Sequence, residues 1–203
     1  MISSQTAFKH VFDTNKWENR ESVSGPGSTR SATSQLLPQL ADLISRRAIA
    51  SLNDAPCGDF NWIAPIAEQV QYRGFDVVPD VIEIARSRAD HPFGVLDIVE
   101  DVLPRADAIL CRDCLVHLPE EMIEKAINNF VRSESRWLLT TTFPELQSNK
   151  RGSLGGWRPI NLQLEPFNFP EPEELLVERP SIPPHETYGR KALGLWPLSA
   201  LDR

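Results

Sequence analysis

The chain has 203 residues, 41% of them hydrophobic and 24% charged, as expected for one globular domain large enough to bury a substantial core. Its net charge of −7 argues against a general nucleic-acid or anionic-membrane binder, because such proteins need a basic face. No apolar run is long enough to span a membrane, residues 1–16 lack the apolar centre of a signal peptide, and three cysteines do not form a disulfide framework, so a cytoplasmic protein is expected.

The first third of the chain begins with polar and glycine-rich sequence. Residues 1–16 show no pattern and predict a loose arm. Residues 17–34 are dense in Ser, Gly and Thr, which is typical of a flexible linker. A tryptophan and several charged residues flank these glycines, which favours instead a loop that closes over a ligand. The predicted organisation is an arm and lid over residues 1–33 and a single domain over residues 34–203.

Strand and helix patterns then alternate along the chain. Residues 34–47 predict a helix, because Leu36, Leu40 and Leu43 recur at helical spacing behind Ser34 as a candidate N-cap. The strands predicted after it are residues 49–54, 72–78, 93–97, 106–111 and 137–142. The helices predicted between them are residues 59–70, 80–88 and 119–131. Five strands that alternate with helices indicate an α/β fold with a parallel, doubly wound sheet.

The alternation ends after Pro144. Two segments near the end of the chain, residues 175–178 and 191–196, have the composition of two last strands. They would pair antiparallel around a loop at residues 180–190.

The turn at residues 54–59, Asp-Ala-Pro-Cys-Gly-Asp, lies between the first strand and a helical pattern. Strand, turn and helix in this order bring backbone N–H groups and a carboxylate to the open edge of an α/β sheet. A dinucleotide-binding turn would read G-x-G-x-x-G, and this one contains a single glycine, Gly58. A cofactor with an amino-acid end and a nucleoside end, such as S-adenosyl-L-methionine, therefore fits better than a pyrophosphate.

The same turn resembles a known family motif. DAPCGDF at residues 54–60 is similar to the D-x-x-x-G-x motif of class I S-adenosylmethionine-dependent methyltransferases, with D-x-P-C-G-D in place of D-x-G-x-G. With WEN at residues 17–19, SGPGST at 24–29 and CRDCLVHL at 111–118, the chain resembles the subgroup of sugar O-methyltransferases that includes the Nod-factor fucosyl 2-O-methyltransferase. The resemblance covers about residues 17–196.

This resemblance implies a fold and an activity. The fold would be a Rossmann-like doubly wound sheet of seven strands with a reversed final strand and helices on both faces. The activity would be methyl transfer from S-adenosyl-L-methionine, with the segment before residue 34 acting as a lid on the cofactor.

Three acids at successive strand ends are the strongest candidates for cofactor binding. Carboxylates of Asp54, Asp76 and Asp97 can accept hydrogen bonds from an ammonium group and a ribose diol, although aspartates at such positions also serve as helix caps. By resemblance, Asp54 and Gly58 line the methionine end, Asp76 the ribose, and Asp97 the adenine amino group. The full set of cofactor residues so predicted is Trp17, Ser24, Gly25, Ser28, Thr29, Asp54, Pro56, Gly58, Asp76, Asp97, Ile98 and Arg112.

The loop after the fourth strand carries the candidate catalytic residues. Methyl transfer to oxygen requires the loss of the hydroxyl proton, so His117 and Asp113 are candidate bases, and an Asp–His pair would set the imidazole tautomer. In the alternative interpretations His117 is a structural histidine at a helix start, Asp113 is a cap, and catalysis rests on positioning. Zinc bound by Cys57, Cys111, Cys114 and His117 is not predicted, because only one C-x-x-C pair is present.

The region after the fifth strand would wall the acceptor pocket. Trp157, Arg158 and Asn161 are candidate substrate-binding residues, since they offer two hydrogen-bond donors to a polyol and an aromatic face on which a sugar or a ring can stack. In the alternative interpretation this region is a proline-rich cover that merely packs on the sheet. The predicted function is O-methylation of a hydroxyl on a small molecule or glycan, without nucleic-acid or membrane partners. The alternatives are N- or carboxyl-methylation, a nucleic-acid methyltransferase, and a cofactor-binding protein without catalysis. A homodimer is compatible with the sequence.

Overall fold

The computed structural model describes residues 3–178 and 190–202, and its strands form one mixed sheet in the order β3-β2-β1-β4-β5-β7-β6. The strands are β1 (Ser51–Asp54), β2 (Gln71–Asp76), β3 (Phe93–Val95), β4 (Ala108–Cys111), β5 (Trp137–Thr142), β6 (Glu174–Glu178) and β7 (Lys191–Pro197). β1 pairs in parallel with β2 and β4, whereas β7 is antiparallel to both β5 and β6. The predicted doubly wound sheet of seven strands with a reversed final strand is confirmed.

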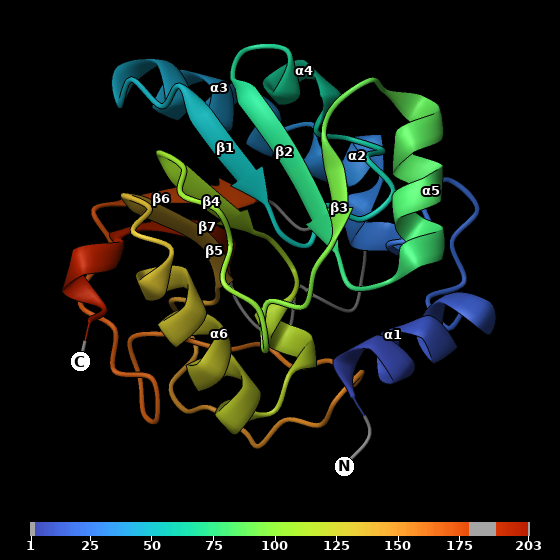
Figure 1. Cartoon of the computed structure of the whole chain (residues 1–203). Coiled ribbons are helices and arrows are strands. Elements are labelled where there is room, and N and C mark those ends of the chain that lie inside the picture. The colour runs from blue at the N-terminus through green and yellow to red at the C-terminus, as the bar shows by residue number, and fades with distance from the viewer. Residues whose placement is uncertain (1–2, 179–189, 203) are drawn as a thin grey trace.

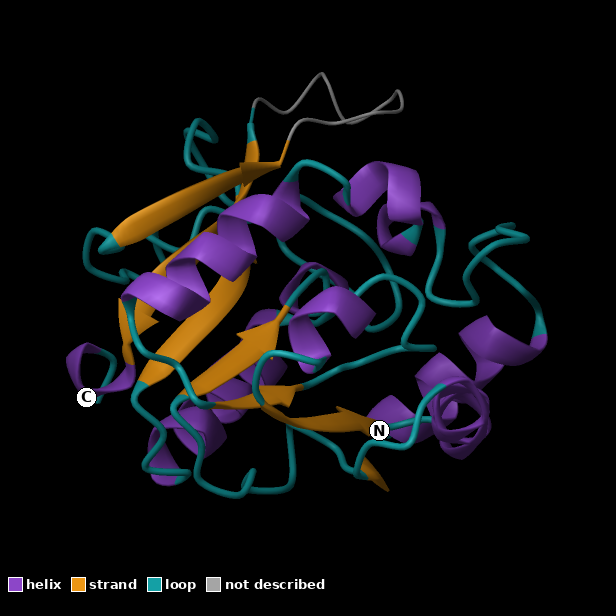
Figure 2. Ribbon diagram, turned by 90° about the horizontal axis from the view of Figure 1, so that it is seen from above, coloured by secondary structure: helices purple, strands orange, loops and turns teal. Residues whose placement is uncertain are grey.

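Helices cover both faces of this sheet (Figure 2). They are α1 (Ser4–Asp13), α2 (Arg30–Thr33), α3 (Leu36–Arg46), α4 (Ala64–Ala67), α5 (Pro79–Arg88) and α6 (Glu120–Arg132). One core cluster joins Leu40 and Leu43 of α3 to α4 and the sheet. The other joins Ile123 and Phe130 of α6 to Trp196 of β7. Because both faces are covered, β4 and β5 are buried along their whole length.

The carboxyl ends of β1 and β2 point toward the side of the molecule where α1 lies (Figure 1). This helix corrects the prediction of a loose N-terminal arm. The hydroxyl of Ser3 caps it by accepting a hydrogen bond from the backbone N–H of Thr6 at 3.2 Å. Phe8, Val11 and Phe12 recur at helical spacing and give the helix an apolar side, on which Val11 is buried.

The helix predicted over residues 34–47 is α3, which starts two residues later and ends one residue earlier than predicted, and the short helix α2 precedes it. In a helix begun at Ser34, the ring of Pro38 would meet the carbonyl of Ser34, so α3 begins at Leu36 and keeps Pro38 in its first turn. Ser34 is not an N-cap: its hydroxyl donates to the carbonyl of Ser31 at 2.8 Å. Thr29 caps α2 instead.

The helix predicted over residues 59–70 is the short α4. Gly58 and Phe60 have left-handed backbone conformations, with φ of 56° and 57°, which no helix accommodates. Pro65 occupies the first turn of α4, where its missing N–H costs nothing. The prediction was wrong because it rested on the spacing of apolar residues and did not take into account the two left-handed backbone conformations.

The remaining elements lie close to their predicted positions. β5 has the predicted bounds, α5 begins one residue earlier than predicted, and α6 begins and ends one residue later than predicted. Of the loop predicted at residues 180–190, residues 180–189 lie outside the described part of the chain. Within the described residues no helix has the length and apolar character needed to cross a bilayer.

Candidate functional site

A cavity of about 390 Å³ lies beyond the carboxyl ends of the strands, between the sheet, α1 and residues 17–28. Its volume is in the range of small-molecule sites, about 300–1,000 Å³. The predicted site residues that line it are Trp17, Ser24, Gly25, Ser28, Asp54, Pro56, Gly58, Asp76, Asp97, Ile98, Arg112, Asp113, His117 and Trp157. Thr29, Arg158 and Asn161 do not line it.

Two of the strand-end acids are buried carboxyl groups with raised pKa values. Asp54 accepts a hydrogen bond from the hydroxyl of Tyr72 at 2.7 Å, yet burial outweighs that bond and raises the pKa of Asp54 to about 7. Asp76 accepts the backbone N–H groups of Gly58 at 3.2 Å and Val78 at 3.0 Å, and burial raises its pKa to about 6. Both groups can gain charge when a cationic or hydrogen-bond-donating ligand arrives.

The third acid, Asp97, joins the sheet to α1. It accepts hydrogen bonds from the hydroxyl of Ser4 and from the backbone N–H of Val99, the latter at 2.9 Å. Ile98 beside it is buried and lines the cavity. Ser4, at the start of α1, was not among the predicted site residues.

Residues 22–24 of the predicted lid are held on the turn that follows β1. The buried carboxylate of Asp59 accepts the hydroxyl of Ser22 at 2.8 Å and the backbone N–H of Val23 at 3.1 Å, and it pairs with Arg88 at 3.0 Å. The hydroxyl of Ser24 lies so close to Gly58 that a Cβ atom there would be 2.2 Å from its oxygen. The single glycine of this turn is therefore required both by its backbone conformation and by the segment packed on it.

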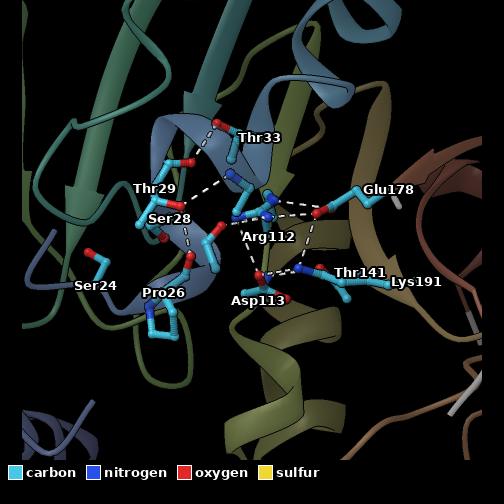
Figure 3. A network of polar contacts seen from close by, with 12 residues as sticks. Ser24, Pro26, Ser28, Thr29, Thr33, Arg112, Asp113, Thr141, Glu178 and Lys191 are labelled. Carbon is cyan, nitrogen blue, oxygen red and sulfur yellow. Dashed lines mark hydrogen bonds and ion pairs between the residues drawn. The ribbon is translucent and has the colours of Figure 1, made fainter. Parts of the chain in front are cut away.

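Four charged side chains that line the cavity form a cluster (Figure 3). The four-charge cluster consists of Arg112, Asp113, Glu178 and Lys191. Arg112 makes two hydrogen bonds to Glu178, at 2.6 and 3.1 Å, and lies 3.3 Å from Asp113. Lys191 pairs with Asp113 and, at 3.1 Å, with Glu178. Arg112 also donates to the carbonyl of Gly27 at 2.9 Å, which ties the lid to the cluster.

The cluster changes the interpretation of Asp113. Burial opposes ionisation of its carboxyl, but the Lys191 ammonium and the Arg112 guanidinium outweigh burial and hold the pKa of Asp113 well below its ordinary value. A carboxylate held in this way is a poor proton acceptor. The predicted Asp–His pair is not formed, since Asp113 bonds to Lys191 and His117 to a different partner.

The partner of His117 is a backbone carbonyl in residues 143–173, the segment between β5 and β6, here called the cover. The Nδ1 atom of His117 lies 2.5 Å from the carbonyl oxygen of Gly156, and a carbonyl oxygen only accepts, so Nδ1 carries the proton and Nε2 the lone pair. Burial lowers the pKa of His117, against the smaller opposing effects of that carbonyl and Asp113. The imidazole is a neutral hydrogen-bond acceptor that lines the cavity.

Two of the predicted substrate-binding residues, Arg158 and Asn161, donate hydrogen bonds to backbone carbonyl groups instead. Arg158 donates to the carbonyl groups of Lys150 at 2.8 Å and Leu118 at 2.7 Å. Asn161 donates to the carbonyls of Pro144 and Leu146, at 3.3 and 3.1 Å. These hydrogen bonds hold the conformation of the cover. The prediction that Arg158 and Asn161 bind the methyl acceptor finds no support.

Several cavity residues were missed by the sequence analysis. Phe8 and Phe12 come from α1, and their helical spacing behind Ser3 was a usable signal. Glu178 and Lys191 meet because β6 and β7 pair in that register, which the local sequence does not reveal. Among the described residues, no three His, Cys, Asp or Glu side chains form a group that could hold a metal.

Comparison with known proteins identifies the fold. No protein-family model and no curated protein matches the chain. Magnesium protoporphyrin IX methyltransferase from Synechocystis PCC 6803 with bound SAM has a TM-score of 0.69 at 13% identity, over 97% of this chain and 98% of that one. The methyltransferase domain of bacterial CtHen1 has a TM-score of 0.57 at 13% identity, over 82% and 99% of the two chains. The chain therefore has the fold of these methyltransferases.

Proposed function

We propose that the protein is a methyltransferase that uses S-adenosyl-L-methionine and methylates a hydroxyl group of a small molecule or glycan. One observation carries the proposal: Asp54, Asp76 and Asp97, from three adjacent strands, line a single cavity in this fold. A structure of the same fold, the porphyrin methyltransferase above, holds SAM. The motif resemblance to sugar O-methyltransferases supports a hydroxyl as the acceptor.

The residues present fit this cofactor. Its ammonium group, ribose hydroxyls and adenine amine are all donors, and the three carboxyl groups are acceptors spaced along the sheet edge. Asp54 and Gly58 would hold the amino-acid end, Asp76 the ribose, and Asp97 with Ile98 the adenine. The raised pKa values of Asp54 and Asp76 agree with sites that gain a partner on binding.

His117 is the proposed general base. When bound, S-adenosylmethionine supplies a methyl group already activated on a sulfonium: the C–O bond forms as the C–S bond breaks, and the electron pair stays on sulfur. The Nε2 atom of His117 takes the hydroxyl proton during this step, because Nδ1–H is held by Gly156. Asp113 is assigned no proton transfer and belongs to the four-charge cluster.

Residues 1–33 are proposed to act with the domain over residues 34–203 as a lid on the cofactor. Three contacts support this role: Ser22 and Val23 on Asp59, and Gly27 on Arg112. Each of these ties the segment to a residue beside the cavity.

A transfer assay with methyl-labelled cofactor tests the proposal. The wild-type protein and His117→Asn are incubated with mixtures of phenols, sugars, amines and carboxylic acids, and products are found by mass spectrometry. Labelled methyl ethers made by the wild type and lost in His117→Asn, with unchanged affinity for S-adenosylhomocysteine, support the O-methyltransferase. Labelled amines or esters favour the alternative acceptors. Binding of S-adenosylhomocysteine without any transfer favours a non-catalytic binding protein.

A further inference from the structure

We infer that the acceptor is a planar aromatic compound bearing a hydroxyl group, bound at the β4–β5 end of the cavity. This inference rests on the proposed function and narrows its substrate class. The rings that would contact it, here called the aromatic subsite, belong to Phe8, Trp17, His117, Phe143 and Trp157, and all five side chains line the cavity.

The sheet order separates this subsite from the acids. β5 lies three strands away from β2, and neighbouring strands are about 4.8 Å apart, so Phe143 after β5 and Asp76 at the end of β2 are separated by roughly 14 Å along the sheet edge. His117 follows β4 and lies between these two ends. A cofactor over β1–β3 would place its reactive end toward His117 and leave the aromatic subsite to the acceptor.

The rings of the subsite are arranged in two groups. Trp17 lies at 36° to the imidazole of His117 with ring centroids 5.2 Å apart, and Phe8 meets the same imidazole edge-on at 6.5 Å. Trp157 meets Phe143 edge-on at 6.1 Å. Trp157 is 39% exposed although it lines a cavity. Edge and offset contacts are the favoured geometries between aromatic rings, so a flat acceptor ring in the cavity can pack against these side chains in the same way.

The polar groups near the subsite do not suit a sugar. A sugar ring needs several donors and acceptors aimed at its hydroxyl groups, and the two predicted for that purpose, Arg158 and Asn161, bond to backbone carbonyls. The charges of the four-charge cluster, two positive and two negative, pair with one another. Among the described residues of the aromatic subsite, the rings and one base, His117, are the groups available to the acceptor, and they match a flat ring with a hydroxyl group.

Direct binding tests the inference independently of turnover. Saturation-transfer NMR and calorimetry with 2-naphthol and with methyl β-D-glucopyranoside are performed on protein saturated with S-adenosylhomocysteine. We expect 2-naphthol to bind and the glucoside not to bind. Trp157→Ala should weaken naphthol binding about five-fold, within the range of one aromatic contact. Trp157→Phe should restore it, and Lys150→Ala, an exposed change in the same cover, should leave it unchanged.

Failure of the inference and failure of the proposed function give different results. Binding of the glucoside in place of 2-naphthol, or naphthol binding that Trp157→Ala leaves unchanged, overturns the aromatic subsite while S-adenosylhomocysteine still binds. Absence of S-adenosylhomocysteine binding overturns the proposed function and this inference with it.

Discussion

The Nδ1 atom of His117 and the carbonyl oxygen of Gly156 lie 2.5 Å apart, which assigns the ring proton to Nδ1 and leaves Nε2 as the acceptor. Replacing His117 by asparagine keeps a donor for Gly156 and removes the base. Loss of a positioned general base lowers kcat by about 10²–10⁴-fold. Calorimetry on the same variant should return the wild-type affinity for S-adenosylhomocysteine, whereas a merely structural histidine would reduce both quantities.

The pH dependence of the reaction should follow the same imidazole. Burial lowers the pKa of His117 below its ordinary value of about 6.5, and the active form is the neutral one. With the cofactor saturating, so that Asp54 and Asp76 are occupied, the kcat/KM for the acceptor should therefore rise with pH through an apparent pKa below about 6.5 and stay level above it. The small residual activity of His117→Asn should lack this acidic limb. A wild-type profile that has no acidic limb at any pH at which the protein stays folded contradicts the assignment.

Asp54 should make the free protein less stable as the pH rises. Its folded pKa of about 7 lies above the ordinary value of 3.8, so its favourable contribution is complete below pH 3.8 and is lost as the pH rises through 7. Asp54→Asn cannot ionise and still offers an acceptor to Tyr72. Its stability relative to wild type, from urea unfolding, should grow between pH 4 and 8 by about 4 kcal/mol at most.

The control for this series is Asp90→Asn, which changes an exposed acid outside the cavity. The change with pH expected for Asp54→Asn should exceed that of this control. A difference between Asp54→Asn and wild type that is the same at pH 4 and pH 8 would show that Asp54 ionises normally in the folded protein.

Removing Glu178 from the four-charge cluster should lower the free energy of unfolding much more than removing Glu100, which lies outside the cluster. Glu178→Ala leaves the buried guanidinium of Arg112 without its main partner, and breaking a buried pair costs about 3–5 kcal/mol. Glu100→Ala removes an ion pair with Lys125 in which both side chains are exposed, and should change the free energy of unfolding by about 0–1 kcal/mol. Equal small effects in denaturant titrations would mean that the cluster does not hold β6 and β7 to the β4 loop.

The lid should loosen when its attachment to the turn is removed. Asp59→Asn weakens the bonds to Ser22 and Val23 and removes the ion pair with Arg88. Limited trypsin digestion should then cut faster at Arg20 and Arg30, which flank the attached segment and are exposed. The exposed Asp90→Asn serves as the matched control. Cleavage of Asp59→Asn at the wild-type rate contradicts the attachment.

Much of the sheet could be predicted because its signals are local. Asp54, Asp76 and Asp97 each follow a short apolar strand, and parallel strands bring their carboxyl ends to one edge, so their meeting in one cavity follows from the order of elements. The single glycine of the turn, Gly58, was also readable as a ligand-facing position. These predictions needed no knowledge of long-range contacts.

The acceptor side of the cavity could not be predicted in the same way. Arg158 has the residue type of a substrate ligand, but it donates to the backbone carbonyl of Lys150 in its own segment and to that of Leu118, 40 positions earlier, which comes close only in the folded chain. The base role of Asp113 failed because Lys191 arrives from β7, 78 positions later. α1 is different, since its cap and apolar spacing were present in the sequence and were overlooked.

Calorimetric titration with S-adenosylhomocysteine tests the central claim most directly, that the cavity over β1–β3 binds this cofactor. The account predicts micromolar-range binding, about −8 kcal/mol, to the wild type and to Asp90→Asn. Asp76→Asn should bind about 10–100-fold more weakly, because it loses a hydrogen bond to a charged acceptor. No detectable binding to the wild type, or equal binding to Asp76→Asn, would contradict the account.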